Sequence, residues 1–375
     1  MALTVAQKFD GPPRIRELDG WRAISALLVV VVHIGTTQHP RLFSRVPGAI
    51  PALVYWGPLA VNIFFVISGF VICRLLNSED SARGSISLKA FYYRRACRIL
   101  PPLYTYLAVL SVLLGVGLIR DSWRAICVAA LFLGDIRHIP IPHSWFIAHT
   151  WSLAIEEQFY LVFPPLFVLT PRRHRRIVCL GVFLLAVLWN LSTAFRDWDW
   201  ITSPQTREGF ACISCGVLMA VFETSARQLA QALSWYVSAS VAIILFIPPF
   251  WAIGFGAALY RSVFVPFAIG LMLLSGVEHR SLLRRFLDCK PVQAIGATSY
   301  GTYLWQQLFT APKVSVTATG AVLNFSPAGE VIPMCLPLLA VVVPLSFLFI
   351  EKPAMRLGKA LSFRAKQQQL AEVSK

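Results

Sequence analysis

The apolar residues of this chain come in continuous runs of about twenty residues, separated by short polar segments. A run of this length can cross a lipid bilayer as an α-helix. The pattern therefore predicts an all-α fold, a polytopic transmembrane helical bundle of about ten spans in a single domain, residues 1–375. The expected spans are 20–38, 52–73, 100–119, 150–169, 177–195, 208–222, 235–252, 260–276, 295–311 and 331–350.

Segment 122–134 is an eleventh apolar run, but about thirteen residues are too few for an ordinary span. If it does not cross, 25 of the 34 Lys and Arg residues lie on the side of the two termini and 9 on the other. If it crosses, the division becomes 15 against 19. Cytoplasmic loops carry the excess of Lys and Arg, so we predict that both termini are cytosolic. Residues 1–19 and 351–375 are then cytosolic segments, and 122–134 is re-entrant or lies at the outer surface.

The composition agrees with a membrane protein, because 57% of the residues are hydrophobic, only 14% are charged, and the mean hydropathy is +0.64. The basic residues behind the net charge of +16 cluster in short loops, which is typical of membrane topology, so we expect no nucleic-acid partner. Cys212 and Cys215 have CxxC spacing without a second ligand pair, and we expect no metal. No small-residue cleavage site follows the first span, which we expect to be retained in a multi-pass protein of the cell (inner) membrane.

The first span carries two ionisable residues, Arg22 and His33, eleven positions apart. This spacing places them on one face of a helix, about 16 Å apart along its axis. Ionisable groups at membrane depth are costly and mark candidate functional sites. His33 is expected about 10 Å below the outer surface, where it could act as an acid–base group. A snorkelling anchor for Arg22 and a structural role for a buried His33 remain open alternatives.

The fourth span carries two adjacent carboxylates, Glu156 and Glu157, at the depth expected for His33. Ser152 and Tyr160 share the face of Glu156 by helical spacing, and we expect both to contact substrate. We predict that Glu156 pairs with His33, and keep Glu157 as the alternative partner. A structural ion pair with an arginine is the other interpretation.

Three arginines, Arg94, Arg95 and Arg98, lie at the inner mouth of the third span. Arginine forks bind phosphate bidentately and stay charged, so this cluster is a candidate phosphate site. Ordinary clustering of positive charge in a cytosolic loop is the alternative explanation. Asn62, a polar residue in the outer half of the second span, is a candidate for lining a cavity, while Ser68-Gly69 on the same span favours close helix packing.

Together these groups predict a site that connects the two sides of the membrane. Arginines at the inner mouth would hold a phosphorylated donor from the cytosol. His33 would take a proton from an acceptor hydroxyl as general base, and Glu156 would orient the imidazole and stabilise its cation. The alternative hypothesis is a transporter or flippase that uses His33 and Glu156 as a proton relay. Transporters more often show inverted repeats with broken span pairs, and the sequence shows no such pairing.

The chain resembles the acyltransferase-3 family of integral membrane O-acyltransferases, because six short motifs occur in the family's order along essentially the whole chain. These are Leu-Asp-Gly-Trp-Arg22 with His33 eleven positions later, Asn-Ile-Phe-Phe-Val-Ile-Ser-Gly-Phe at 62–70, Arg95-x-x-Arg98-Ile-Leu-Pro, Trp-Ser-Leu-Ala-Ile-Glu-Glu-Gln-Phe-Tyr at 151–160, Ser-Tyr-Gly-Thr-Tyr-Leu-Trp at 299–305 and Phe-Ile-Glu-Lys-Pro at 349–353.

The resemblance implies an acyl-CoA donor, usually acetyl-CoA, at the cytosolic face, and a carbohydrate or glycolipid acceptor on the far side, with membrane lipid around the protein. The family often has Asp where Asn62 stands and His where Gln306 stands, so the acceptor contacts near Gln306 are expected to differ. Some members carry a further esterase-like C-terminal domain, which we do not expect here. The residues to which the resemblance gives functional weight are Arg22, His33, Arg95, Arg98, Trp151 and Glu156.

Overall fold

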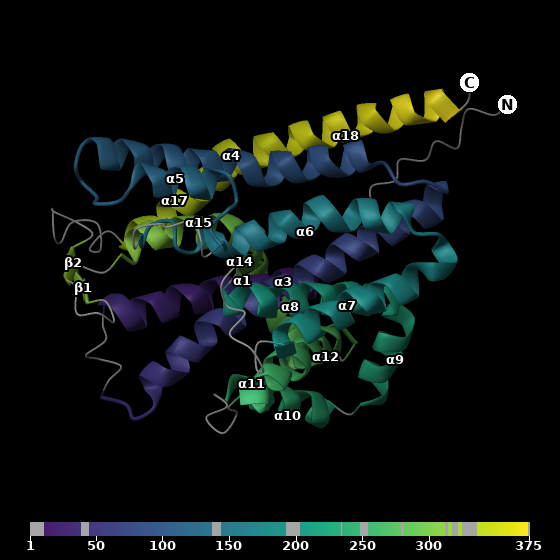
Figure 1. The fold of residues 1–375 in the computed structure, drawn as a ribbon, viewed down its shortest axis with the longest axis horizontal. Coiled ribbons are helices and arrows are strands. Elements are labelled where there is room, and N and C mark those ends of the chain that lie inside the picture. Colours follow the sequence, from purple (N-terminus) through teal and green to yellow (C-terminus); the bar gives the residue numbers. More distant parts are fainter. Residues whose placement is uncertain are drawn as a thin grey trace.

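The computed structural model is a helical bundle with one short β-hairpin (Figure 1). It describes residues 11–38, 45–136, 144–192, 203–233, 235–247, 254–278, 281–311, 314–316, 322–324 and 336–373. The helices are α1 (Arg16–His33), η1 (Ile34–Gln38), α3 (Ala49–Arg83), α4 (Leu88–Gly115), α5 (Trp123–Ala130), α6 (Thr150–Leu169), η2 (Arg172–His174), α7 (Arg175–Ser192), α8 (Pro204–Val221), α9 (Glu223–Ala232), α10 (Trp235–Phe246), α11 (Gly254–Leu259), η3 (Tyr260–Phe264), α12 (Val265–Glu278), α13 (Leu282–Leu287), α14 (Lys290–Ala297), α15 (Ser299–Phe309), η4 (Leu336–Leu338), α17 (Leu339–Ser346), η5 (Phe347–Glu351) and α18 (Lys352–Val373). Strands β1 (Val314–Val316) and β2 (Val322–Asn324) pair antiparallel.

Six of the described helices are long and apolar enough to cross a bilayer. A seventh candidate is the pair α8 and α9, which bends by 92°. These seven correspond to seven of the ten spans expected from the sequence. The six helices are Arg16–Thr37, Ala49–Arg83, Leu88–Gly115, Thr150–Leu169, Arg172–Ser192 and Phe255–Glu278.

The other three expected spans are not among these seven candidates. For 235–252, whose last five residues lie outside the described part, the structure has the twelve residues of α10, and 295–311 is divided between α14 and α15 at Thr298. The run 331–350, whose first five residues lie outside the described part, holds η4, α17 and η5, which continue without a break into α18. Ten of the eleven residues of α15 are buried, so this helix lies within protein. A break in a helix is tolerated there because neighbouring helices cover the exposed backbone.

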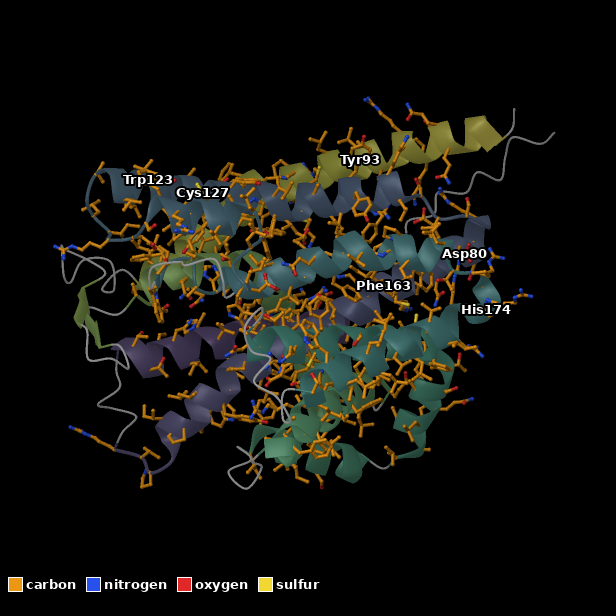
Figure 2. All side chains as sticks on the ribbon, in the orientation of Figure 1. Asp80, Tyr93, Trp123, Cys127, Phe163 and His174 are labelled. Atoms are coloured by element: carbon orange, nitrogen blue, oxygen red, sulfur yellow. The ribbon has the colours of Figure 1, made fainter. Side chains whose placement is uncertain are left out.

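The segment 122–134 contains only α5, eight residues long, which is too short to cross a bilayer. Trp123 and Cys127 of α5 lie at one end of the molecule, and Asp80 and His174 lie at the other (Figure 2). This separation matches the expectation that α5 and the basic turn around His174 face opposite sides of the membrane. Which end is cytosolic stays a prediction from the charge distribution.

Helices α3 and α8 approach each other backbone to backbone. A Cβ atom added at Gly69 of α3 would overlap the carbonyl oxygen of Ile213, and one added at Gly216 of α8 would overlap that of Val66. Small residues permit such close helix packing in membranes. The expectation that Ser68-Gly69 marks a packing contact is therefore confirmed, and this contact fixes the face of α3 that carries Ser68.

Many of the basic residues near the end that carries Asp80 are paired with carboxylates. Asp80 accepts hydrogen bonds from Arg172 at 2.6 Å and from Arg175 at 2.7 Å. Lys366 of α18 contacts buried Glu79 of α3 at 2.6 Å, which anchors the last helix to the bundle.

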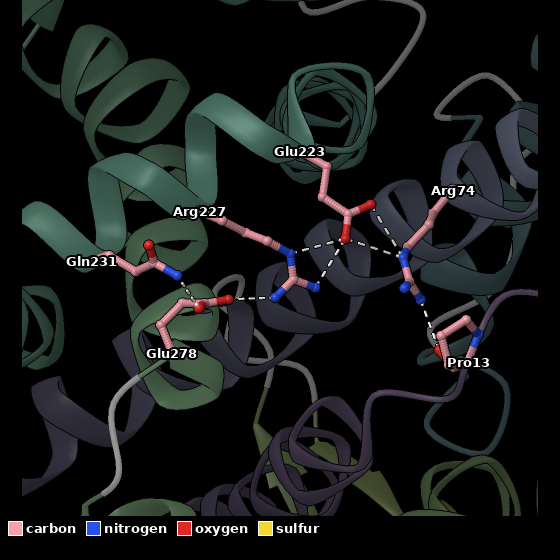
Figure 3. A network of polar contacts seen from close by, with 6 residues as sticks. All are labelled: Pro13, Arg74, Glu223, Arg227, Gln231 and Glu278. Atoms are coloured by element: carbon pink, nitrogen blue, oxygen red, sulfur yellow. Dashed lines mark hydrogen bonds and ion pairs between the residues drawn. The ribbon is translucent and has the colours of Figure 1, made fainter.

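A second polar network joins α3, α9 and α12 to the chain before α1 (Figure 3). Arg74 contacts Glu223 at 3.1 Å and donates to the carbonyl of Pro13 at 2.8 Å. Arg227 bonds both Glu223 and Glu278. These networks compensate the charges of partly buried groups, so the cations involved are structural.

Candidate active site

Five helices, α1, α3, α4, α6 and α15, contribute residues to the lining of one cavity inside the bundle. The polar side chains that line it come from segments far apart in the sequence. They are Arg22, Ser68, Arg95, Arg98, Ser152, Glu156, Ser299, Tyr300 and Tyr303.

The positive charge of the cavity comes from Arg22, Arg95 and Arg98. Arg22 has Asp19 at 3.3 Å, whereas no ion pair with a carboxylate is found for Arg95 or Arg98 among the described residues. The guanidinium of Arg95 lies over the ring of Tyr160, 4.9 Å from its centroid, in a cation–π contact that fixes its direction. The cavity therefore presents at least two guanidinium groups without a carboxylate partner, an arrangement suited to an anionic ligand.

Glu156 is the carboxylate of this cavity. The hydroxyls of Ser68 and Tyr160 both donate hydrogen bonds to its Oε1 atom. Glu157, one position further along α6, does not line the cavity, because a step of one residue turns the side chain by about 100° around the helix. The structure therefore favours Glu156 over Glu157 as a residue of the cavity.

His33 ends α1 and is directly followed by the π-helical turn η1. Its Nδ1 atom lies 2.8 Å from Oε1 of Gln306 on α15, and its ring meets Trp145 edge-on with centroids 5.2 Å apart. Nε2 of Gln306 is 3.0 Å from Oε1 of Gln307 and acts as the donor in that contact. Oε1 of Gln306 must therefore accept from His33, which places the imidazole proton on Nδ1 and leaves the lone pair of Nε2 free.

The expected pairing of His33 with Glu156 is not what the structure shows. Among the described residues there is no hydrogen bond or ion pair between the two, because Glu156 bonds Ser68 and Tyr160, and His33 bonds Gln306. The sequence predicts that His33 and Glu156 lie at the same depth in the membrane. It does not predict which helices are neighbours, so equal depth does not imply contact. Gln306 takes the orienting position that the sequence analysis gave to Glu156.

A polar and aromatic layer separates the cavity from His33. Tyr303, one turn before Gln306 on α15, shares a hydrogen bond with Ser152 at 2.7 Å and donates to the carbonyl of His149 at 3.1 Å. The rings of Tyr106 and Tyr303 pack edge-on against the imidazole of His149. Sequence analysis missed Tyr303 and His149, although the motif at 299–305 contains Tyr303.

Three further predicted residues, besides His33, Glu157 and Tyr160, do not line the cavity. Arg94 contacts Glu79 at 3.6 Å and Ser362, so the contacts that the structure gives it are structural, and its expected contact with the donor stays a prediction. Trp151 packs edge-on against Phe65. Asn62 is buried and lines a second cavity together with Glu208 and Arg261, which form an ion pair at 3.0 Å.

No group of three or more His, Cys, Asp or Glu side chains that could hold a metal ion occurs in the described part of the chain.

The apolar helices and the polar cavity inside them define a multi-pass membrane protein with a ligand site in its helical bundle. The chain belongs to the acyltransferase-3 family, because residues 15–351 match that family's acyltransferase domain. The predicted family is thus confirmed.

The relatives of this chain include O-acetyltransferases. The chain is 27% identical over 386 residues to the peptidoglycan O-acetyltransferase OatA of Listeria monocytogenes, covering 92% of this chain and 56% of the relative. It is also 27% identical over 391 residues to the O-acetyltransferase OatA of Staphylococcus aureus, covering 96% of this chain and 60% of the relative. The chain therefore spans little more than half the length of these relatives. No solved structure matches it.

Proposed function

We propose that this protein is a membrane O-acetyltransferase that moves an acetyl group from acetyl-CoA to a hydroxyl of an envelope carbohydrate. The observation that carries the proposal is the convergence of Arg22, Arg95 and Arg98 on one cavity, with His33 bonded to Gln306, one turn along α15 from the cavity-lining Tyr303. Family membership favours acyl transfer over the transporter alternative. The names of the relatives make peptidoglycan the first acceptor to test.

Acetyl-CoA enters this scheme as the anionic donor. Its phosphate groups suit guanidinium groups that have no carboxylate partner, since each fork can give two charge-assisted hydrogen bonds. Glu156 supports this part of the site by accepting from Tyr160, over whose ring the Arg95 guanidinium lies. In this scheme Glu156 positions the donor site and does not pair with the base.

His33 is the general base of the proposed reaction. Nε2 takes the proton of the acceptor hydroxyl as the oxygen attacks the acetyl carbonyl, the C–S bond breaks, and the sulfur leaves with the bonding electrons. The hydrogen bond from Nδ1 to Gln306 holds the ring in the tautomer that this step requires. General-base catalysis of this kind typically contributes a factor of about 10²–10⁴ in rate.

The test uses membrane vesicles, acetyl-CoA labelled in the acetyl group, and peptidoglycan fragments as acceptor. Wild-type vesicles should label the carbohydrate, and His33→Ala should reduce the rate by about 10²-fold or more. His174→Ala is the matched control, because His174 is exposed in the turn before α7. Equal labelling by the wild type and His33→Ala would refute the role of His33, and no labelling of carbohydrate by the wild type would refute the proposed activity.

A further inference from the structure

His149 is a buried histidine whose ring has no hydrogen-bond partner. Only 4% of the residue is exposed, and neither Nδ1 nor Nε2 finds a partner among the described residues. Burying polar atoms without partners costs free energy, and such atoms in a native structure call for an explanation. The unpartnered nitrogens are the starting point for a functional role.

The position of His149 explains what that role could be. Trp145, four residues earlier, packs its ring edge against His33. Tyr303, three residues before the partner of His33 on α15, packs its ring against His149 with centroids 5.4 Å apart. Tyr303 and Ser152, which are hydrogen-bonded to each other, line the cavity. His149 therefore lies in the layer between His33 and the cavity.

The proposed reaction needs a group that transfers a proton between His33 and the cavity. The proton that His33 takes from the acceptor hydroxyl has to reach the sulfur of CoA, which leaves as a thiolate on the cavity side. No hydrogen bond leads from His33 to a cavity-lining side chain in the described part of the chain, because the one recorded for its ring goes to Gln306. The layer that holds His149 separates the two ends of this transfer.

We propose that His149 relays the proton from His33 to the cavity, through the hydroxyl of Tyr303, to the CoA thiolate. This inference rests on the proposed acetyl transfer. A neutral imidazole can accept a proton at one nitrogen and donate from the other, and in His149 neither nitrogen is held by a structural hydrogen bond to a described residue. The sum of the steps converts acetyl-CoA and an alcohol into an acetate ester and CoA, with the alcohol proton on sulfur.

Burial keeps the relay neutral between turnovers. Burial, and to a smaller extent the charge of nearby His33, lowers the pKa of His149 to about 3. A proton arriving at one nitrogen is therefore passed on from the other and does not remain on the ring.

The experiment measures kcat and KM for acetyl-CoA in His149→Phe and His149→Gln, with melting temperatures in detergent. Phenylalanine keeps the aromatic packing against Tyr106 and Tyr303, and glutamine keeps hydrogen-bonding groups but cannot carry the proton. We expect both variants to lose kcat by about 10²-fold or more, with KM for acetyl-CoA changed less than threefold. His174→Phe, the same substitution at an exposed site, should behave as the wild type.

Any of the following results would refute the proposal that His149 relays the proton. Wild-type kcat in His149→Phe would show a packing role, and wild-type kcat in His149→Gln would show a static hydrogen bond. A rise in KM with unchanged kcat would assign His149 to donor binding. If both variants fail to fold, His149 is structural. If the wild type transfers acetyl groups and the two His149 variants do so equally well, the relay is refuted but the proposed function is not. If the wild type transfers no acetyl group, the proposed function is refuted.

Discussion

Replacing Gln306 by leucine tests the geometry on which the proposed chemistry depends. The amide of Gln306 is the only recorded hydrogen-bond partner of the His33 ring in the described part of the chain, and Gln306 is fully buried. Without it, the Nδ1 proton of His33 is left unsatisfied, which costs about 1–3 kcal/mol. At about 1.4 kcal/mol for each factor of ten, the population of the productive tautomer should fall by roughly 5- to 100-fold.

The assay is the steady-state rate of acetyl transfer at saturating acetyl-CoA. We expect kcat of Gln306→Leu to fall by the roughly 5- to 100-fold given above, while KM for acetyl-CoA stays within a factor of about two. Gln231→Leu, which removes an exposed amide elsewhere, is the control. Gln306→Glu should stay active, but the acid side of its pH–rate profile should move to higher pH, because a carboxylate beside His33 stabilises the charged imidazole. Wild-type kcat in Gln306→Leu would refute the assignment of Gln306 as the group that orients the base.

Three further predictions address the donor site, the packing and the topology. Arg98→Gln should raise KM for acetyl-CoA by about 10- to 100-fold, since a hydrogen bond to a charged group is worth about 1.5–3 kcal/mol. Arg173→Gln, at an exposed arginine, is the control. If KM is the same in the two variants, Arg98 makes no phosphate contact. Gly69→Ala should lower the melting temperature in detergent by several degrees, because the added Cβ would overlap the carbonyl of Ile213. Gly181→Ala is the control and should not lower it, since the space around its Cβ is open. Equal melting temperatures for the two variants would contradict the close α3–α8 contact. In a variant whose native Cys127 is replaced by serine, a cysteine introduced at Trp123 should react with a membrane-impermeant thiol reagent added outside the cell. A cysteine introduced at His174 in the same background should react only from the cytosol. The reverse pattern would show that the orientation is the opposite of the one proposed.

The helical periodicity of the sequence predicts which side chains share a face of one helix. Arg95 and Arg98 on α4, and Ser152 and Glu156 on α6, share faces in this way, and all four line the cavity. That the arginines and Glu156 line the same cavity was not expected, because the sequence analysis placed the arginines at the inner mouth and Glu156 in the outer half beside His33. The choice between adjacent residues is less secure, as Arg94 shows. It lies one position from Arg95, but it forms an ion pair with Glu79 and does not line the cavity.

The partner of His33 could not be predicted from the sequence. Depth in the membrane follows from distance along a helix, but the neighbour around the helix axis depends on how the bundle packs. Gln306 lies on α15, an apolar segment that reads as part of a span although it is a short buried helix. Hydropathy does not distinguish an apolar run that faces lipid from one that faces protein. The described residues hold seven candidates for the ten expected spans, so the count of ten stays a prediction.

The direct contact between the backbones of α3 and α8 has a consequence for how substrates enter. Two helices that touch through their main chains have no side-chain layer that could shear, so we expect them to form a stationary wall on one flank of the cavity. Any widening that admits the donor or releases the acetylated product would then have to come from the opposing helices α4, α6 and α15. Cross-linking α3 to α8 should leave turnover intact, and tethering α4 to α15 should stop it.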